Sequence, residues 1–304
     1  MVRAARSGDS APIQPVASCA SSQSPSSTAC WRRQRADPGP RRRSRGSQHG
    51  AGQGLPATGG WLPLVFSSGP LTAGNGWRDQ ADVLVRARLA ADALGATPLA
   101  RPERVAVHSL TGEVYLAIVG GSAALFCTGH EEKSAPEASA AMSVSGAGRY
   151  GQVIRWTETG GAVAWEVFLS GGDSALTSDG MFAGPKNLWF GADGKLWIST
   201  GTPGHSLADA DDAIFAAAGN NALLVTGTRT REVARFLVAP RGAEVAGVSA
   251  NPDGDALFVN IQHPGQRTLH WGRPTAGNPQ AVSSWPDGEA GARPRSATVT
   301  VRKT

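Results

Sequence analysis

The chain has 304 residues and a formal net charge of +5, and 40% of its residues are hydrophobic. This length accommodates one large domain or two small ones. No apolar run has the form of a signal peptide or a membrane span. The three cysteines (Cys19, Cys30 and Cys127) are odd in number, show neither metal-ligand spacing nor a redox pair, and do not indicate a compartment.

The first 58 residues differ in composition from the rest of the chain. They contain nine Arg, no Lys and two Asp, with many Ser, Pro, Gln and Gly, so they carry the positive charge of the whole protein. Such a segment cannot bury enough apolar surface to offset its ordering entropy, and we predict a disordered leader over residues 1–58. Arginine runs at 32–35 and 41–45 are compatible with contacts to nucleic acid. Because no aromatic residues are interleaved with the arginines and no recognition helix accompanies them, we favour a solvated or artefactual leader and expect no specific nucleic-acid partner.

A folded domain is predicted from residue 59 to residue 304. Near its start, residues 79–95 are rich in Ala and Leu and end at Gly95, which predicts a single helix. The remainder of the domain is dominated by patterns typical of strands.

Three similar hairpins follow the helix. Each has a lead-in, a strand of alternating apolar residues, a glycine turn and a second apolar strand, and they cover residues 101–116, 184–198 and 242–265. The turn glycines are Gly112, Gly194 and Gly254, and their unequal spacing indicates insertions between the repeats.

The first strand of each hairpin begins with one polar residue. Since side chains alternate along a strand, Glu244 is expected on the same face as Ala246 and Val248, and Glu103 and Lys186 are expected at equivalent places. Repeated sheets of this kind build β-propellers, whose inner strands start around a shared channel. We therefore predict an all-β fold, an incomplete and irregular β-propeller with one N-terminal helix and a disordered leader. A β-sandwich is the alternative fold.

A glycine motif at residues 146–151 matches the dinucleotide-binding fingerprint. That chemistry needs a helix N-terminus facing the pyrophosphate, whereas residues 153–156 have a strand pattern. The sequence therefore argues against a nucleotide site here.

From about residue 61 to its end, the chain resembles the PhoX-type alkaline phosphatases, which are calcium- and iron-dependent phosphomonoesterases built on a β-propeller. The segments that carry the resemblance include Gln80-Ala81-Asp82-Val83-Leu84-Val85, Arg101-Pro102-Glu103, Arg149-Tyr150-Gly151, Asn220-Asn221, Phe258-Val259-Asn260-Ile261-Gln262-His263-Pro264-Gly265, Ser284-Trp285-Pro286-Asp287 and Arg293-Pro294-Arg295-Ser296-Ala297. The resemblance covers only the C-terminal part of the family pattern. Family members carry a twin-arginine leader and the first part of the propeller ahead of this region.

The resemblance implies a site for Ca²⁺ and Fe³⁺ that acts on phosphate monoesters. It makes Glu103 and Glu244 metal ligands, since carboxylates at a channel suit hard cations that neutralise phosphate and activate a water. His263 either orients the substrate or braces the corner after Asn260. Arg101 either meets a phosphate oxygen or is structural.

Three departures from the family pattern fall in the predicted channel. The family reads Pro-Asp where this chain has Pro185-Lys186, Thr-Asp where it has Thr200-Gly201, and a paired Asn where Gly120-Gly121 stands. A Lys in place of a ligand repels metal ions. We therefore expect a truncated and impaired phosphoric monoester hydrolase, or alternatively a non-catalytic propeller fragment or binding scaffold.

The family is exported to the periplasm or medium, although no signal peptide is recognisable here, and we expect no membrane partner.

Overall fold

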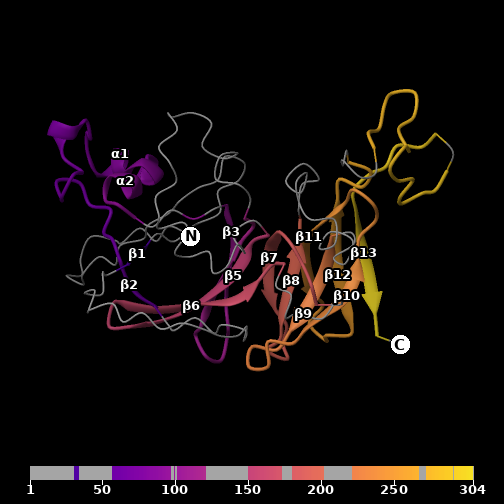
Figure 1. The fold of residues 1–304 in the computed structure, drawn as a ribbon, viewed down its shortest axis with the longest axis horizontal. Coiled ribbons are helices and arrows are strands. Elements are labelled where there is room, and N and C mark those ends of the chain that lie inside the picture. The colour runs from indigo at the N-terminus through magenta and orange to yellow at the C-terminus, as the bar shows by residue number, and fades with distance from the viewer. Residues whose placement is uncertain are drawn as a thin grey trace, which may run out of the picture. The chain divides into compact units, whose positions relative to one another are not determined.

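The computed structural model describes residues 31–33, 57–96, 99, 101–120, 150–172, 180–201, 221–266, 272–289 and 291–303 (Figure 1). Most of the predicted leader and most of the glycine motif at 146–151 lie outside the described residues, and the domain boundary after residue 58 stays a prediction. The chain divides into two compact units. Unit 1 comprises residues 1–99 and 156–166, and unit 2 comprises residues 100–155 and 167–304.

Strands dominate the described residues, which confirms the prediction of an all-β fold. The elements are β1 (Trp31–Arg33), β2 (Ala57–Trp61), the 3-10 helix η1 (Ala73–Asn75), α1 (Gln80–Val85), α2 (Ala87–Ala93), β3 (Pro102–Val107), β4 (Val114–Ile118), β5 (Gln152–Thr159), β6 (Ala162–Ser170), β7 (Pro185–Phe190), β8 (Leu196–Thr200), β9 (Ala222–Thr226), β10 (Val233–Val238), β11 (Glu244–Ala250), β12 (Ala256–Gln262) and β13 (Ala297–Arg302). Within the part of the chain that the structure describes, no helix is both long and apolar enough to span a membrane.

Unit 1 contains both α-helices. The predicted helix over residues 79–95 is present but interrupted, because Arg86 leaves the helical conformation at φ −100° and ψ 34°. Its guanidinium lies 4.1 Å from the centre of the Trp77 ring and donates to the carbonyl oxygen of Gly76 at 3.0 Å. The two short helices cover a small core formed by Leu64, Leu71, Trp77, Val83, Ala87, Ala90 and Ala91.

Asp82 links the start of α1 to the arginines on either side of it. Its carboxylate accepts from the guanidinium of Arg86 and, at 3.1 Å, from that of Arg78. The hydrogen bond from Arg86 is the main reason that the pKa of Asp82 falls from 3.8 to about 2. The backbone N–H of Asp82 in turn donates to the side chain of the N-cap residue Asp79 at 2.7 Å. This bond satisfies one of the first backbone N–H groups of the helix, which have no partner within it.

We expect Asp82→Asn to lower the melting temperature of the protein at neutral pH. A carboxylate whose pKa is lower in the folded than in the unfolded state stabilises the fold above the unfolded pKa, and this stabilisation is lost as pH falls through the folded pKa. The difference in melting temperature between wild type and variant should therefore shrink between about pH 4 and pH 2. Asp92→Asn, at an exposed position in α2, is the control and should melt like wild type. Equal melting of Asp82→Asn and wild type at pH 7 would contradict the role of the carboxylate.

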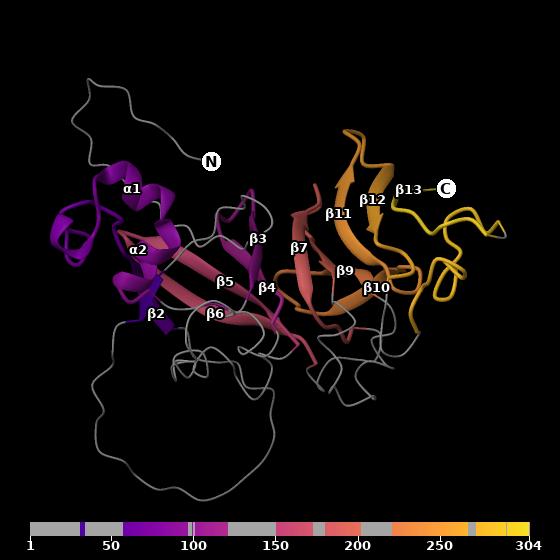
Figure 2. The same ribbon diagram turned by 90° about the horizontal axis from the view of Figure 1, so that it is seen from above.

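Unit 2 contains the three predicted hairpins, β3/β4, β7/β8 and β11/β12, all antiparallel. Strands β7 and β8 continue into the sheet β10-β9-β8-β7, and β11 and β12 into the sheet β11-β12-β13. The three turn glycines all have positive φ, between 71° and 74°. Figures 1 and 2 show β3, β7 and β11 following one another in that order, and contacts join β3 to β7 and β7 to β11. The first strands of the hairpins are thus neighbours, as the inner strands of a propeller are.

Two apolar clusters hold unit 2 together. One lies between the β3/β4 hairpin, the inner ends of β5 and β6, and the sheet of β7 to β10, and includes Tyr115, Phe168 and Leu188. The rings of Tyr115 and Phe168 meet edge to face with centroids 5.1 Å apart. The other cluster joins that sheet to β11 and β12 through Leu223, Val245 and Ile261. Burial of these side chains is the main source of stability for the sheets, at about 25 cal/mol per Å² of apolar surface.

A β-bulge interrupts the first strand of every hairpin. The pairing shifts between Pro102 and Arg104 in β3, between Pro185 and Asn187 in β7, and between Val245 and Gly247 in β11. Strict alternation is therefore wrong for β11: Val248 packs against the same cluster as Val245 instead of facing the side of Glu244. The extra residue of a bulge shifts the face of the residues beyond it.

Candidate functional site

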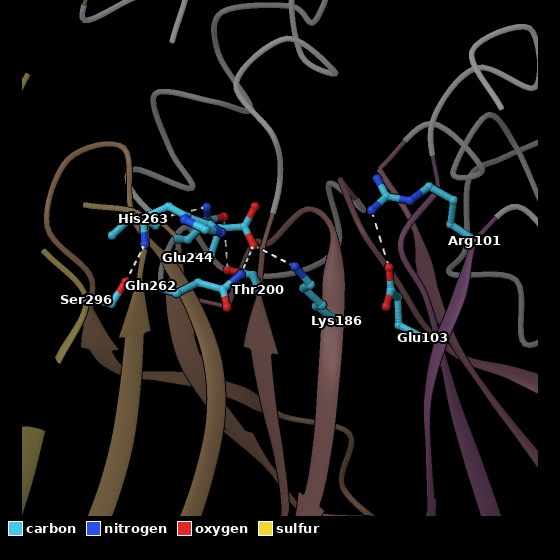
Figure 3. Close-up of polar contacts among 10 residues, drawn as sticks. Arg101, Glu103, Lys186, Thr200, Glu244, Gln262, His263 and Ser296 are labelled. Carbon is cyan, nitrogen blue, oxygen red and sulfur yellow. Dashed lines mark hydrogen bonds and ion pairs between the residues drawn. The ribbon is translucent and has the colours of Figure 1, made fainter. Parts of the chain in front are cut away.

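The polar residues singled out by the sequence lie at one end of the inner strands of unit 2. Figure 3 shows Glu103 at the start of β3, Lys186 at the start of β7 and Glu244 at the start of β11. The bulges in β3 and β7 fall at Glu103 and Lys186, so these two positions are equivalent. In β11 the bulge falls at Ala246, and Glu244 lies two residues nearer the beginning of its strand.

Glu244 is a buried carboxylate with two donors on the same oxygen. Lys186 Nζ lies 2.6 Å from Glu244 Oε2, and Gln262 Nε2 donates to that oxygen at 3.0 Å. Gln262 is the cross-strand partner of Glu244 in the β11/β12 ladder. The side chain of Glu244 is 8% exposed and that of Lys186 is 25% exposed. A short charge-assisted contact of this kind neutralises the carboxylate from within the protein.

Hydrogen bonds between side chains and backbone, and between backbone groups, hold the ends of the strands around Glu244. The Thr200 hydroxyl accepts from the N–H of Ala222 at 2.8 Å, and the side-chain amide of Asn221 donates to the carbonyl of Ala243 at 2.9 Å. The N–H of Gly201 donates to the carbonyl of Gly184 at 2.9 Å. The ends of β8 and β9 and the lead-ins to β7 and β11 are therefore tied together next to the ion pair.

Glu103 forms a second ion pair, with Arg101 on the lead-in to β3. Arg101 Nη2 lies 3.3 Å from Glu103 Oε1, and both side chains are about one-fifth exposed, at 21% and 20%. The backbone of Arg101 has a φ of 59°, in the left-handed region that non-glycine residues rarely adopt. Ser67, Arg231 and His263 share this conformation, so it does not by itself mark a functional residue, and the role of Arg101 stays a prediction.

His263 lies beyond the end of β12, directly after Gln262. It too has a left-handed backbone, with a φ of 55°, and its N–H donates to the Ser296 hydroxyl at 3.2 Å. It lines a cavity of about 590 Å³ together with residues of the Arg293–Ser296 segment. Glu103, Glu244 and Arg101 do not line this cavity. The hydrogen bond to Ser296 is made by the backbone of His263 and does not involve its imidazole, so both the catalytic and the bracing role of the side chain stay predictions.

The predicted metal ligands do not have the surroundings of a metal site. Each of the two carboxylates faces a protein cation, Lys186 for Glu244 and Arg101 for Glu103. Among the described residues, no three His, Cys, Asp or Glu side chains gather closely enough to hold an ion. Hard cations such as Ca²⁺ take six to eight oxygen ligands. The donors in the described part of the chain therefore do not fit the calcium and iron that the resemblance implies.

Sequence reasoning identified both ends of the Lys186–Glu244 contact but missed Gln262 as the third member. Gln262 belongs to the Gln-His-Pro-Gly corner and becomes visible only through the hairpin register. Counting back from the Ala250–Leu257 pair without a bulge would place Glu244 opposite His263, whereas the bulge places it opposite Gln262. Nothing in the sequence marks Ala246 as a bulge position.

Fold and site together define a propeller-like protein of antiparallel sheets with charged side chains at the starts of its inner strands. The model of the family described as alkaline phosphatase PhoX matches residues 34–265, and the chain belongs to this family. A solved structure, Pseudomonas fluorescens PhoX in complex with vanadate, a transition state analogue, is similar to the chain, with 31% sequence identity and a TM-score of 0.64. The match covers 81% of this chain and 41% of that chain, so the protein spans well under half the length of that relative. No curated protein matches the sequence.

Proposed function

We propose that this protein is a phosphoric monoester hydrolase of the PhoX type with an impaired metal site. Membership of the family supports a phosphate ester as substrate and makes a metal cofactor plausible. Calcium and iron as the particular metals, and export to the periplasm or medium, are carried over from the family resemblance alone. The observation on which the impairment rests is the 2.6 Å contact that commits Glu244 to Lys186.

Arg101 is the residue that best supports phosphate binding. It lies at the same end of the inner strands as Lys186 and keeps about one-fifth of its side chain exposed (Figure 3). A guanidinium matches phosphate oxygens with paired donors, and its hydrogen bonds to charged groups are each worth about 1.5–3 kcal/mol. Its contact with Glu103 holds the side chain at the strand end.

A non-catalytic binding scaffold is the second candidate. It is favoured by the pairing of both predicted metal ligands with protein cations, because a site without metal lacks the means to activate a water. Such a protein would still bind a phosphate ester through its cationic side chains.

The purified chain, assayed with p-nitrophenyl phosphate in the presence of calcium, is expected to show slow turnover and less than one equivalent each of bound iron and calcium. Arg101→Ala should lower kcat/KM about 10–100-fold, because it removes charge-assisted hydrogen bonds to the substrate. Arg104→Ala, at an exposed position in β3 three residues after Arg101, is the matched control and should leave turnover unchanged.

The other possible results of this assay distinguish the two candidate functions. Stoichiometric iron and calcium with ordinary turnover would reject the impairment. Binding of the ester without turnover would favour the scaffold, and absence of both binding and turnover would reject both candidates. Equal losses in the Arg101 and Arg104 variants would contradict the role of Arg101.

A further inference from the structure

Gly201 leaves open the space that the Lys186 side chain occupies. A Cβ at position 201 would lie 2.6 Å from Lys186 Cδ and 3.1 Å from Glu244 Oε2. A contact this short requires one partner to shift, and the flexible Lys186 side chain can move more easily than the backbone, so a side chain at this position would displace the lysine from Glu244. The backbone of Gly201 cannot readily move away, because its N–H is bonded to the carbonyl of Gly184.

The glycine is not required by its backbone conformation. Gly201 is outside the set of glycines with positive φ, so an alanine could adopt its φ without strain. The requirement for glycine is therefore steric and comes from Lys186 and Glu244.

The ammonium of Lys186 is in direct contact with the Glu244 carboxylate, at hydrogen-bond distance. The bulge at Lys186 takes this residue out of the regular pairing of β7, and its ammonium contacts the same Glu244 oxygen that accepts from Gln262. The ammonium and the amide together supply this oxygen with two donors. A divalent ion approaching the Glu244 carboxylate would be repelled by the positive charge of Lys186, which already contacts that carboxylate.

We propose that Lys186 is a resident cation of this site, admitted by the missing side chain at Gly201, and that Glu244 is consequently not a metal ligand. The absence of a side chain at Gly201 leaves the space that Lys186 occupies, and the ammonium of Lys186 neutralises the Glu244 carboxylate. The inference deepens the proposed function and rests on it only for the assignment of these strand ends as the site.

A double-mutant cycle on stability tests the steric half of the proposal. Gly201→Ala is expected to lower the melting temperature by a few degrees in the wild-type background, because the added methyl group displaces Lys186 from the buried Glu244 carboxylate. In a Lys186→Ala background the same substitution should cost much less, because its main obstacle is gone. Equal costs in the two backgrounds would overturn the proposal.

Calcium titration followed by thermal melting tests the charge half. A Lys186→Ala/Gly201→Asp variant places a second carboxylate next to Glu244, and its melting temperature should rise with added CaCl₂. The matched Lys186→Ala/Gly201→Asn variant should show no more response than wild type. The proposal is overturned if calcium stabilises wild type and Glu244→Gln abolishes that effect, or if the Asp and Asn variants respond alike.

Neither measurement uses a substrate, so the proposal can fail while the protein still hydrolyses phosphate esters. Conversely, an inactive protein that passes both tests would reject the proposed hydrolase and leave the resident cation in place.

Discussion

Gly151→Ala is expected to abolish stable folding of unit 2. A Cβ at this position would lie 2.5 Å from the carbonyl oxygens of both Ile118 and Val119 and 2.7 Å from Pro185 Cδ. These atoms belong to the end of β4, the residue after it and the start of β7, so none of them can turn aside as a long side chain can. Gly151 also has a φ of 80°, which adds backbone strain for any other residue. Clash and strain together should cost about 3–5 kcal/mol or more.

The local hydrogen bonds explain why the chain passes so closely at Gly151. Its carbonyl accepts from the N–H of Gly171 at 2.8 Å, and the carbonyl of Tyr150 accepts from the N–H of Gly184 at 2.8 Å. Residues 150 and 151 therefore link β5 to the segments that follow β6 and precede β7. Movement of the backbone to accommodate a methyl group would break this junction.

Gly254→Ala is the matched control. Gly254 has a similar φ of 72°, but a Cβ there meets no atom within 4 Å. Its cost should be that of the left-handed conformation alone, about 1–2 kcal/mol, or a few degrees in melting temperature. The measurement is soluble yield together with urea unfolding of each variant. Similar behaviour of the two variants would show that close packing at Gly151 adds nothing.

Gly151 also shows that the structural reason for a glycine can be one that its sequence motif does not reveal. The strand pattern after it predicted that residues 146–151 are not a dinucleotide site, and β5 begins at Gln152 as expected. The reason for the glycine is a close approach of the end of β4 and the start of β7, both of which are distant from it in the sequence. Distant packing of this kind has no local signature in a sequence.

The hairpins themselves were predictable because their signals are local. Alternating apolar residues around a glycine turn specify a strand pair, and all three turn glycines have the positive φ that such turns need. The neighbouring arrangement of β3, β7 and β11 followed from the repetition. The positions of the bulges could not be predicted in this way, since they depend on how the two strands of each hairpin pair at the end away from the turn.

The charges at the strand ends were predicted in position but not in pairing. Repetition placed Glu103, Lys186 and Glu244 at one end of the sheets, and the structure places them there (Figure 3). The contact between Lys186 and Glu244 crosses from one hairpin to the next and depends on space at Gly201, a third segment. Such a three-way dependence is a property of tertiary packing, so the sequence drew attention to Lys186 and Gly201 without showing that the lysine pairs with Glu244 or that the glycine provides its space.

Lys186→Met is expected to destabilise the protein by about 2–3 kcal/mol. Methionine keeps much of the length and volume of lysine but removes its charge, which leaves the buried Glu244 carboxylate with the neutral amide donor of Gln262. Breaking a buried ion pair from one side commonly costs about 3–5 kcal/mol, and partial exposure of Lys186 reduces this figure. Urea unfolding at neutral pH measures the loss.

Removal of the opposite partner should cost less, and removal of both should restore most of the stability. Glu244→Gln leaves an ammonium that is already 25% exposed and can turn its head into water, so we expect a loss of about 1 kcal/mol. In Lys186→Met/Glu244→Gln no buried charge is left without a partner, and the double variant should be more stable than Lys186→Met alone. Strictly additive losses would mean that the two side chains merely lie close together. Coupling of 1 kcal/mol or more would show that the lysine supplies the charge that this carboxylate needs in the folded protein.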